Sequence, residues 1–334
     1  MSAGARQASV SVIMPTYNCS RFIAEALDSI LAQSVRPSEI IVVDDGSTDD
    51  TAARLAPYLA HIRYERQENR GVSAARNNGV GRATGEFVAF LDADDVWHPR
   101  KLELQLRALA DNPGLALLGT GIFAWPTTAF PEIDVRSHGR VIQVTWPELV
   151  VKNALGTSSI VVRAEILRRA GEFDTRMHGS EDRDLWLRVA EMAPVGNLEL
   201  PLMGLRALPG SLSRRARTCQ TGMLRLLQKL DGRGAWKGRR LLRRKAYSYV
   251  HHSCSLIWDE AGERRTALLA CLKSFLWYPL PYRRPEAALW LERPRRFLVI
   301  LLRLLGLKPA VPEPVPELVD ERGERRGVPA RIWR

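Results

Sequence analysis

Three short apolar runs, each followed directly by polar residues, constrain the fold of this 334-residue chain more than any other feature. The runs are residues 10–14, 40–43 and 87–91, and segments of helical character separate them. Strand and helix therefore alternate over residues 10–110, a pattern that predicts a parallel sheet covered by helices, an α/β fold. In open α/β sheets ligands bind beyond the carboxyl ends of the strands, so the polar residues after each run become candidates for a site.

Asp92 and Asp94 follow the third run and are the strongest of these candidates. Side chains alternate across a strand, so two residues separated by one position project to the same side. Paired carboxylates of this kind suit Mg²⁺ or Mn²⁺, which prefer oxygen ligands and often bridge to substrate phosphates. The alternative is that these acidic residues, together with Asp95, cap a helix that is predicted to begin near Pro99.

The first two runs lead into comparable polar loops. Pro15 is expected to stop the first strand, and Tyr17 follows it. Asp45 lies in DDGSTDDT after the second run, where turn formation and helix capping are the alternative to ligand binding. Arg76 lies in NRGVSAARN, a turn followed by a helix start, where a guanidinium can pair with a base carbonyl or a phosphate or can simply be solvated.

Two later segments add further candidates. GSEDRDLW, residues 179–186, begins a predicted amphipathic helix that carries Glu181 and Asp182. Unpaired N–H groups and the macrodipole favour carboxylates at a helix start, so a structural role is the alternative to that of a catalytic base. RALPGSLSR, residues 206–214, has the composition of a lid that phosphate contacts can order, and an exposed linker is the alternative.

Taken together, these segments resemble family 2 of the glycosyltransferases, which has the GT-A fold. The matching stretches are VSVIMPTYN, IIVVDDGSTDDT, NRGVSAARN, GEFVAFLDADD and GSEDRDLWLRVA, within residues 9–215. The resemblance implies a mostly parallel GT-A sheet flanked by helices, here followed by a basic α-helical C-terminal extension. It also implies an inverting transfer of a sugar from a nucleotide-diphosphate sugar, with a UDP-sugar expected, to an acceptor hydroxyl.

The resemblance also implies how the donor and a metal are bound. It assigns donor binding to Pro15, Tyr17, Asp45, Arg76, Asp92 and Asp94. Tyr17 is expected to lie against the nucleobase and Asp45 to accept hydrogen bonds from the base edge. Asp94 is expected to bind a divalent Mg²⁺ or Mn²⁺ directly, and Asp92 to bind the ribose, the metal or a metal-bound water.

The remaining roles concern the acceptor and the lid. Asp182 is the expected base that takes the acceptor's proton, with Glu181 as its neighbour or as an acceptor ligand. Arg206, Ser211 and Arg214 are candidates for a lid over the diphosphate. The expected acceptor is a lipid-linked saccharide or a cell-surface glycan, and a protein or soluble sugar is the alternative.

The charge of the chain is unevenly placed. The formal net charge is +12, and residues 213–334 hold 27 of the 49 Lys and Arg but 11 of the 37 Asp and Glu. The cations of this region alternate with Leu, Phe and Trp, which is typical of helices that lie on an anionic membrane surface. A helical subdomain packed on the catalytic domain is the alternative. No nucleic-acid-binding motif accompanies the charge, which disfavours a nucleic-acid partner.

The sequence predicts three regions. They are a catalytic domain at residues 1–212, a basic amphipathic helical region at 213–308 and a disordered tail at 309–334. The longest apolar run, residues 297–302, is far shorter than the ~20 residues that span a bilayer. The four cysteines lack metal-ligand spacing, and no signal peptide is recognised. We therefore expect a cytoplasmic protein, peripheral on the inner face of the cell membrane.

Two other functions compete with glycosyl transfer. A nucleotidyltransferase on a related fold would require a Gly-rich basic loop for a triphosphate after the first strand, and PTYNCSRF is not such a loop. A non-catalytic nucleotide-sugar-binding homologue is expected to have lost Asp94 or the pair of Glu181 and Asp182. Both features are present, so the sequence favours an enzyme.

Overall fold

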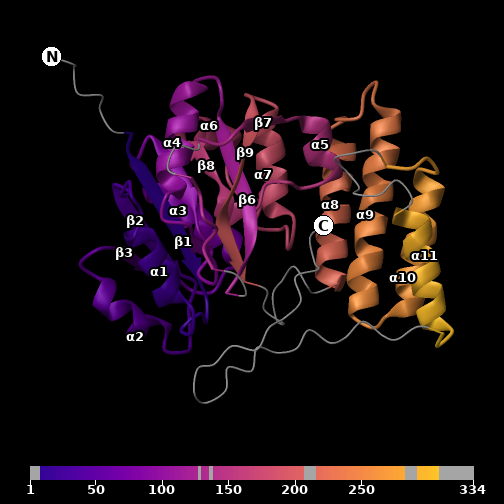
Figure 1. Ribbon diagram of the computed structural model, residues 1–334, viewed down its shortest axis with the longest axis horizontal. Coiled ribbons are helices and arrows are strands. Elements are labelled where there is room, and N and C mark those ends of the chain that lie inside the picture. Colours follow the sequence, from indigo (N-terminus) through magenta and orange to yellow (C-terminus); the bar gives the residue numbers. More distant parts are fainter. Residues whose placement is uncertain (1–7, 127–128, 135–137, 207–215, 283–291, 308–334) are drawn as a thin grey trace. The chain divides into compact units, whose positions relative to one another are not determined.

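The computed structural model describes residues 8–126, 129–134, 138–206, 216–282 and 292–307 (Figure 1). The chain forms two compact units. The first consists of residues 1–146, 154–175 and 182–207, and the second of residues 147–153, 176–181 and 208–334. The predicted boundary at residues 212 and 213 and the predicted tail at residues 309–334 lie outside the described residues.

The first unit is built on a nine-stranded sheet formed by the described residues. The strands are β1 (Val10–Thr16), β2 (Glu39–Asp44), β3 (Arg63–Arg66), β4 (Phe87–Phe90), β5 (Val96–Trp97), β6 (Leu117–Trp125), β7 (Val141–Val144), β8 (Val161–Arg163) and β9 (Val195–Arg206). Their order is β3-β2-β1-β4-β8-β6-β9-β5, and β7 pairs with β9. The first four strands are parallel, as predicted, whereas β8 is antiparallel to both β4 and β6. The sheet is therefore mixed, and the α/β fold is confirmed.

Helices and short 3₁₀ turns connect these strands. They are α1 (Ile23–Leu31), α2 (Thr51–Leu55), η1 (Ala56–Tyr58), α3 (Val72–Arg82), α4 (Lys101–Asp111), α5 (Trp146–Val151), η2 (Thr157–Ser159), α6 (Ala164–Ala170) and α7 (Glu181–Ala190). In a parallel β–α–β connection the helix runs back across the sheet, so the start of α3 lies near the carboxyl ends of β1 and β2.

Contrary to prediction, β1 does not stop at Pro15. It continues to Thr16, and Pro15 lies within the strand. The amide of Leu91 donates to the carbonyl of Ile13 at 3.1 Å, which shows that odd-numbered residues of β1 bond toward β4. Because β4 ends at Phe90, the missing N–H of Pro15 falls beyond the neighbouring strand and removes no ladder bond.

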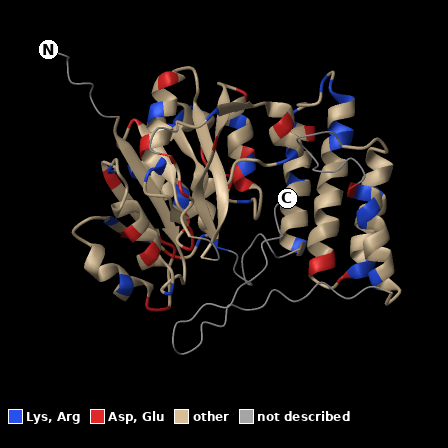
Figure 2. Cartoon of the chain, viewed as in Figure 1, with Lys and Arg blue, Asp and Glu red and all other residues tan. Residues whose placement is uncertain are grey.

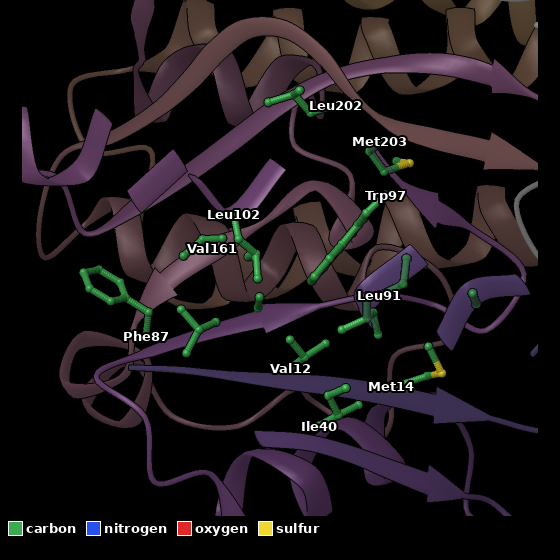
Figure 3. Close-up of a cluster of buried hydrophobic side chains, with 14 of the residues drawn as sticks. Val12, Met14, Ile40, Phe87, Leu91, Trp97, Leu102, Val161, Leu202 and Met203 are labelled. Carbon is green, nitrogen blue, oxygen red and sulfur yellow. The ribbon is translucent and has the colours of Figure 1, made fainter. Parts of the chain in front are cut away.

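Both faces of the sheet are covered by helices. On one face the apolar side chains of β1, β2 and β4 meet α1 and α4, and Figure 3 shows Val12, Ile40 and Leu91 among the buried residues of this cluster. Each fully buried aliphatic side chain of this kind contributes about 1.5–3 kcal/mol. On the other face α3 approaches β1 closely, because a Cβ at Gly79 would lie 2.5 Å from Cγ2 of Ile13.

Lys101 is buried in this core at the start of α4. Its Nζ donates to Oε1 of Gln105 at 2.8 Å and lies 4.0 Å from the ring centroid of Trp97. Among the described residues, no carboxylate forms an ion pair with it. Burial lowers the pKa of Lys101 well below its ordinary value of 10.5, because a charge is poorly solvated there.

Besides most of α5, the second unit contains four helices among the described residues. They are α8 (Ala216–Gly232), α9 (Arg240–Glu260), α10 (Arg264–Trp277) and α11 (Glu292–Leu304). Ala267 and Cys271 of α10 pack against Ile300 of α11 in a small buried cluster. This region therefore forms helices, as predicted, and they bury apolar residues among themselves.

Buried Arg293 fixes the end of α10. Its guanidinium donates to the carbonyl oxygens of Tyr278 at 2.6 Å and of Ser274 at 3.2 Å. The last carbonyls of a helix lack partners within it, and the guanidinium supplies one for the carbonyl of Tyr278, which follows the helix. The same guanidinium lies 4.2 Å from the ring centroid of Tyr282, which adds a cation–π contact.

One face of α10 is both apolar and basic. Leu269 and Leu276 are 59% and 77% exposed, and Leu272 between them is also exposed. Arg265 and Lys273 are exposed on the same face, since positions separated by three, four or seven residues align along a helix. Figure 2 shows Lys and Arg in blue along α9, α10 and α11. None of the described helices is long and apolar enough to cross a bilayer.

Candidate active site

Several predicted site residues converge at the carboxyl edge of the parallel strands. Thr16 of β1 is in register with Asp44 of β2, and Ile13 of β1 is in register with Phe90 of β4. The residues that directly follow these strands therefore reach the same edge of the sheet. Tyr17, Asp45, Asp92 and Asp94 belong to these segments.

Tyr17 stands on a loop that Asn18 holds in place. Oδ1 of Asn18 accepts hydrogen bonds from the amides of Thr48 at 2.8 Å and Asp49 at 3.3 Å. The amide of Asn18 donates to Oγ of Ser47 at 3.0 Å, and its φ of 50° lies in the left-handed region that Asn tolerates well. Tyr17 is 47% exposed beside this loop. No role for Asn18 is predicted from the sequence, although an Asn after a strand is a turn signal.

Asp45 is buried and holds the turn that precedes α3. Its Oδ1 accepts from Nε2 of Gln67 at 2.7 Å and from the amide of Arg70 at 2.9 Å. Its Oδ2 accepts from the amide of Gly71 at 2.8 Å. Asp45 therefore neither caps α2 nor closes its own loop, but bonds a segment 25 residues further along the chain, and its carboxylate lies at the start of α3.

Arg76 is fixed on Asp92 rather than solvated. Its Nη2 donates to both oxygens of Asp92, at 2.8 and 3.1 Å. The guanidinium is buried and lies 5.4 Å from the ring centroid of Phe173. The side chain of Asp92 is itself 31% exposed, so one end of this ion pair reaches the surface of the sheet edge. The pair links α3 to the carboxylates that follow β4.

Asp94 lies in a crowded acidic environment. Burial, and then the nearby charge of Asp92, raises the pKa of Asp94 to about 6 from its ordinary 3.8. Asp95 is fully enclosed, and burial together with the charge of Asp94 raises the pKa of Asp95 well above its ordinary value. Two carboxylates held this close repel each other when both are ionised.

These carboxylates fit a divalent cation. Mg²⁺ and Mn²⁺ prefer oxygen ligands, and a bound cation would relieve the repulsion between Asp92 and Asp94. Among the described residues, no group of three or more His, Cys, Asp or Glu is arranged to hold a metal ion. Asp92 and Asp94 are therefore the residues at this edge that could hold such an ion, and burial makes the charge of Asp94 costly when no cation is bound.

Asp95 does not cap α4. The residue before α4 is Arg100, and no side chain caps that helix. Oδ2 of Asp95 instead accepts from Oγ of Ser158 at 2.7 Å, and Oδ1 accepts from the amide of Arg206 at 3.1 Å. Asp95 therefore ties the loop after β4 to η2 and to the end of β9.

Asp182 lies in the first turn of α7. Its Oδ1 accepts from the amide of Arg183 at 2.6 Å, and its Oδ2 accepts from Oγ1 of Thr157 at 3.3 Å. Glu181 is the first residue of the helix, and Ser180 before it has a φ of 70°. The helix start that the sequence predicted is present, and Asp182 contacts the same 3₁₀ turn as Asp95.

Arg206 belongs to the sheet and not to a lid. It is the last residue of β9, and its Nε donates to the carbonyl of Asp94 at 3.0 Å. Its guanidinium also pairs with Glu25 of α1. The prediction that a loop begins at Arg206 is therefore wrong, because its backbone pairs with β6 and its side chain bonds within the first unit. Ser211 and Arg214, the other predicted lid residues, lie outside the described residues.

Solved structures share this fold. The structure of Staphylococcus aureus TarS 1-349 in complex with UDP-GlcNAc superposes with a TM-score of 0.55 at 18% identity, covering 81% of this chain and 89% of that one. The mannosyltransferase PcManGT from Pyrobaculum calidifontis, in complex with GDP-Man and Mn²⁺, gives 0.56 at 21% identity, covering 90% and 88%. At these identities the likeness establishes the GT-A fold alone.

Sequence comparison identifies the family. The model of the family described as "Glycosyl transferase family 2" matches residues 11–140. The putative glycosyltransferase EpsE of Bacillus subtilis (strain 168) is 34% identical over 218 residues, which cover 63% of this chain and 77% of EpsE. Chondroitin synthase of Escherichia coli is 28% identical over 196 residues, which cover 55% of this chain and 27% of that protein. The chain therefore belongs to family 2 of the glycosyltransferases.

Proposed function

We propose that this glycosyltransferase moves a sugar from a nucleoside diphosphate sugar to a hydroxyl of a glycan or lipid-linked saccharide, with inversion in a single displacement. The observation that supports this most is the pair of crowded carboxylates, Asp92 and Asp94, at the open edge of the sheet. Tyr17 is exposed at the same edge, and Asp182 shares the turn η2 with Asp95. In this proposal Tyr17 faces the nucleobase, and Asp92 and Asp94 face the diphosphate through a metal. Asp182 faces the attacking hydroxyl.

The residues have distinct tasks in this proposal. Tyr17 stacks on the base, and Asp45 binds the base edge or keeps the turn before α3 in position. Arg76 orients Asp92, which binds the ribose or the metal. Asp94 and Asp92 would hold Mg²⁺ or Mn²⁺, which when bound neutralises negative charge on the departing diphosphate.

The acceptor side relies on α7. Asp182 accepts the proton of the attacking hydroxyl, and Glu181 is its neighbour or binds the acceptor. Holding donor and acceptor in line supplies a large share of the rate, because a bimolecular encounter becomes effectively intramolecular. The neighbouring structures hold UDP-GlcNAc, or GDP-Man with Mn²⁺, which supports a nucleotide-sugar donor and a divalent metal. We take a UDP-sugar as the first donor to test.

Thermal unfolding with a panel of nucleotides tests this proposal. A ligand that binds only the folded state stabilises it by about 2.7 kcal/mol at a concentration near 100 times Kd. We expect one nucleoside diphosphate, UDP first, to raise the melting temperature with Mn²⁺ and not with a chelator. A shift by triphosphates alone would indicate nucleotidyl transfer. No shift with any nucleotide would support the non-catalytic alternative.

We further propose that α10 binds the anionic inner face of the cell membrane, where a lipid-linked acceptor would be presented. Exposed Leu269, Leu272 and Leu276 alternate with Arg265 and Lys273 on one face. Such a face buries its leucines at the headgroup boundary while its cations meet anionic lipids.

Vesicle flotation measures this binding. Burying a half-exposed Leu contributes about 1 kcal/mol, so changing all three leucines to Gln should reduce the bound fraction about tenfold or more. Leu59→Gln, at an exposed leucine of the first unit, is the matched control and should bind like the wild type. Equal binding to neutral phosphatidylcholine and to phosphatidylglycerol vesicles, or no effect of the triple change, would contradict the proposal.

A further inference from the structure

The loop that carries Asp92 and Asp94 is closed by one buried hydroxyl. Oγ of Ser158 accepts a hydrogen bond from the amide of Asp92 at 3.1 Å and donates to Oδ2 of Asp95 at 2.7 Å. Ser158 is 2% exposed, so water does not compete for these bonds. The hydroxyl uses its donor and an acceptor position at the same time, so its orientation is fixed, and it links Asp92 and Asp95 at the two ends of the loop.

The preceding residue holds the proposed base. Oγ1 of Thr157 donates to Oδ2 of Asp182 at 3.3 Å. The other oxygen of Asp182 accepts from the amide of Arg183, so the carboxylate is held from two directions. Thr157 and Ser158 are consecutive residues of η2, yet one contacts α7 and the other contacts the loop after β4.

The turn η2 is itself fixed by the core. Nε1 of Trp97 donates to the carbonyl of Ser158 at 2.7 Å, and Nε2 of Gln105 donates to the carbonyl of Ser159 at 3.0 Å. Fully buried bonds of this kind leave η2 little freedom to move relative to the sheet.

We propose that η2 is the positioning element that sets the distance between the donor carboxylates and the base. Ser158 places the loop of Asp92 and Asp94, and Thr157 places Asp182. Neither residue touches the reacting atoms. This inference rests on the proposed function, because it concerns how the two halves of that reaction are aligned. A displacement of about 1 Å between reacting groups can reduce a rate about a hundredfold, so a rigid connection between them has a kinetic value.

The two hydroxyls should affect different kinetic constants. Thr157→Val removes the hydroxyl and keeps the shape, and it should reduce kcat by about 10- to 100-fold with an unchanged Kd for the nucleoside diphosphate and Mn²⁺. Thr157→Ser restores the hydroxyl and should restore kcat to within about threefold. Ser158→Ala should weaken nucleoside diphosphate binding about tenfold, measured by calorimetry, because the metal-binding loop loses its closure.

Ser159→Ala is the matched control. It changes the same kind of residue in the same turn, but that hydroxyl donates to the carbonyl of Gly156, directly before η2, at 2.7 Å rather than to a site carboxylate. It should lower the melting temperature slightly and keep kcat and Kd within about threefold of the wild type. Circular dichroism and thermal unfolding of every variant establish that the fold is retained.

Specific outcomes would overturn the inference. Thr157→Val and Thr157→Ser with equal kcat would show that the hydroxyl is irrelevant. If Ser158→Ala and Thr157→Val both changed kcat and Kd by the same factors, the turn would have a structural role only. If the wild type binds a nucleoside diphosphate and transfers sugar while Thr157→Val and Ser158→Ala change kcat and Kd in the same way, this inference alone is wrong. If the wild type binds no nucleotide, the proposed function itself fails.

Discussion

Replacing Asp182 by Asn is expected to lower kcat for sugar transfer by a factor of about 10² to 10⁴, the usual contribution of a general base. Asn has the same shape, and its oxygen can still accept from the amide of Arg183, so α7 should remain in place. It cannot take the acceptor's proton. The Kd for the nucleoside diphosphate with Mn²⁺ should stay within about threefold of the wild type, because the substitution leaves the donor carboxylates intact.

Asp184→Asn is the control for this prediction. Asp184 lies on the same helix, is buried, and pairs with Arg188 at 2.9 Å. Its replacement should reduce thermal stability, since it leaves Arg188 without its carboxylate partner, and should not reproduce the loss of kcat. Transfer by Asp182→Asn at the wild-type rate would show that another group is the base.

The second large effect is expected at Asp94. Asp94→Asn should abolish metal-dependent binding of the nucleoside diphosphate and, at the same time, stabilise the ligand-free protein near neutral pH. The pKa of Asp94 is raised from 3.8 to about 6, so the folded protein favours the protonated form. Carrying the charge above that pH costs at most about 3 kcal/mol, which corresponds to the difference between the two pKa values.

The sign of the pH dependence follows from that shift. Below the ordinary pKa of 3.8 the carboxyl is protonated in both the folded and the unfolded chain, and the penalty is absent. The penalty grows as pH rises from 3.8 toward 6 and is complete above 6. The wild type without metal should therefore match Asp94→Asn in stability near about pH 4 and be less stable near about pH 7.

Denaturant unfolding in the presence of a chelator, at both pH values, measures the stability, and calorimetry with Mn²⁺ measures donor binding. Asp111→Asn is a suitable control, because Asp111 is an exposed carboxylate at the end of α4. It should change neither property. A variant at Asp94 that is less stable than the wild type near about pH 7 would show that the charge is stabilised in the folded state.

The part of the fold that sequence predicted well is the part with local signals. β1, β2 and β4 are apolar runs that end in turn residues, and burial on both faces requires such runs in a parallel sheet. Because parallel strands end at one edge, the residues after them could be grouped before their geometry was known. The sequence alone therefore groups Asp92, Asp94 and Tyr17 at this edge, and it also predicts the helix start at Asp182. Their roles in binding and catalysis stay predictions.

The parts that sequence did not predict depend on partners far apart in the chain. The amide of Arg206 donates to Asp95, a residue more than a hundred positions earlier in the chain. The composition of residues 206–214 predicts a lid instead, because local sequence does not reveal such a distant partner. Ser158 and Thr157 are small polar residues in a short turn, and no pattern reveals that their hydroxyls reach Asp92 and Asp182. The prediction for Pro15 is wrong because the effect of this proline depends on where β4 ends, which the local sequence does not determine.

The burial of Lys101 couples folding to the release of a proton. In the unfolded chain its amine is protonated near neutral pH, whereas the folded core, where its partner is the amide of Gln105, favours the uncharged amine. At a pH between the pKa of Lys101 in the folded chain and that in the unfolded chain, folding therefore releases a proton to the solvent, and unfolding binds one. Alkaline buffers draw this equilibrium toward the native chain, up to the ordinary lysine pKa of 10.5.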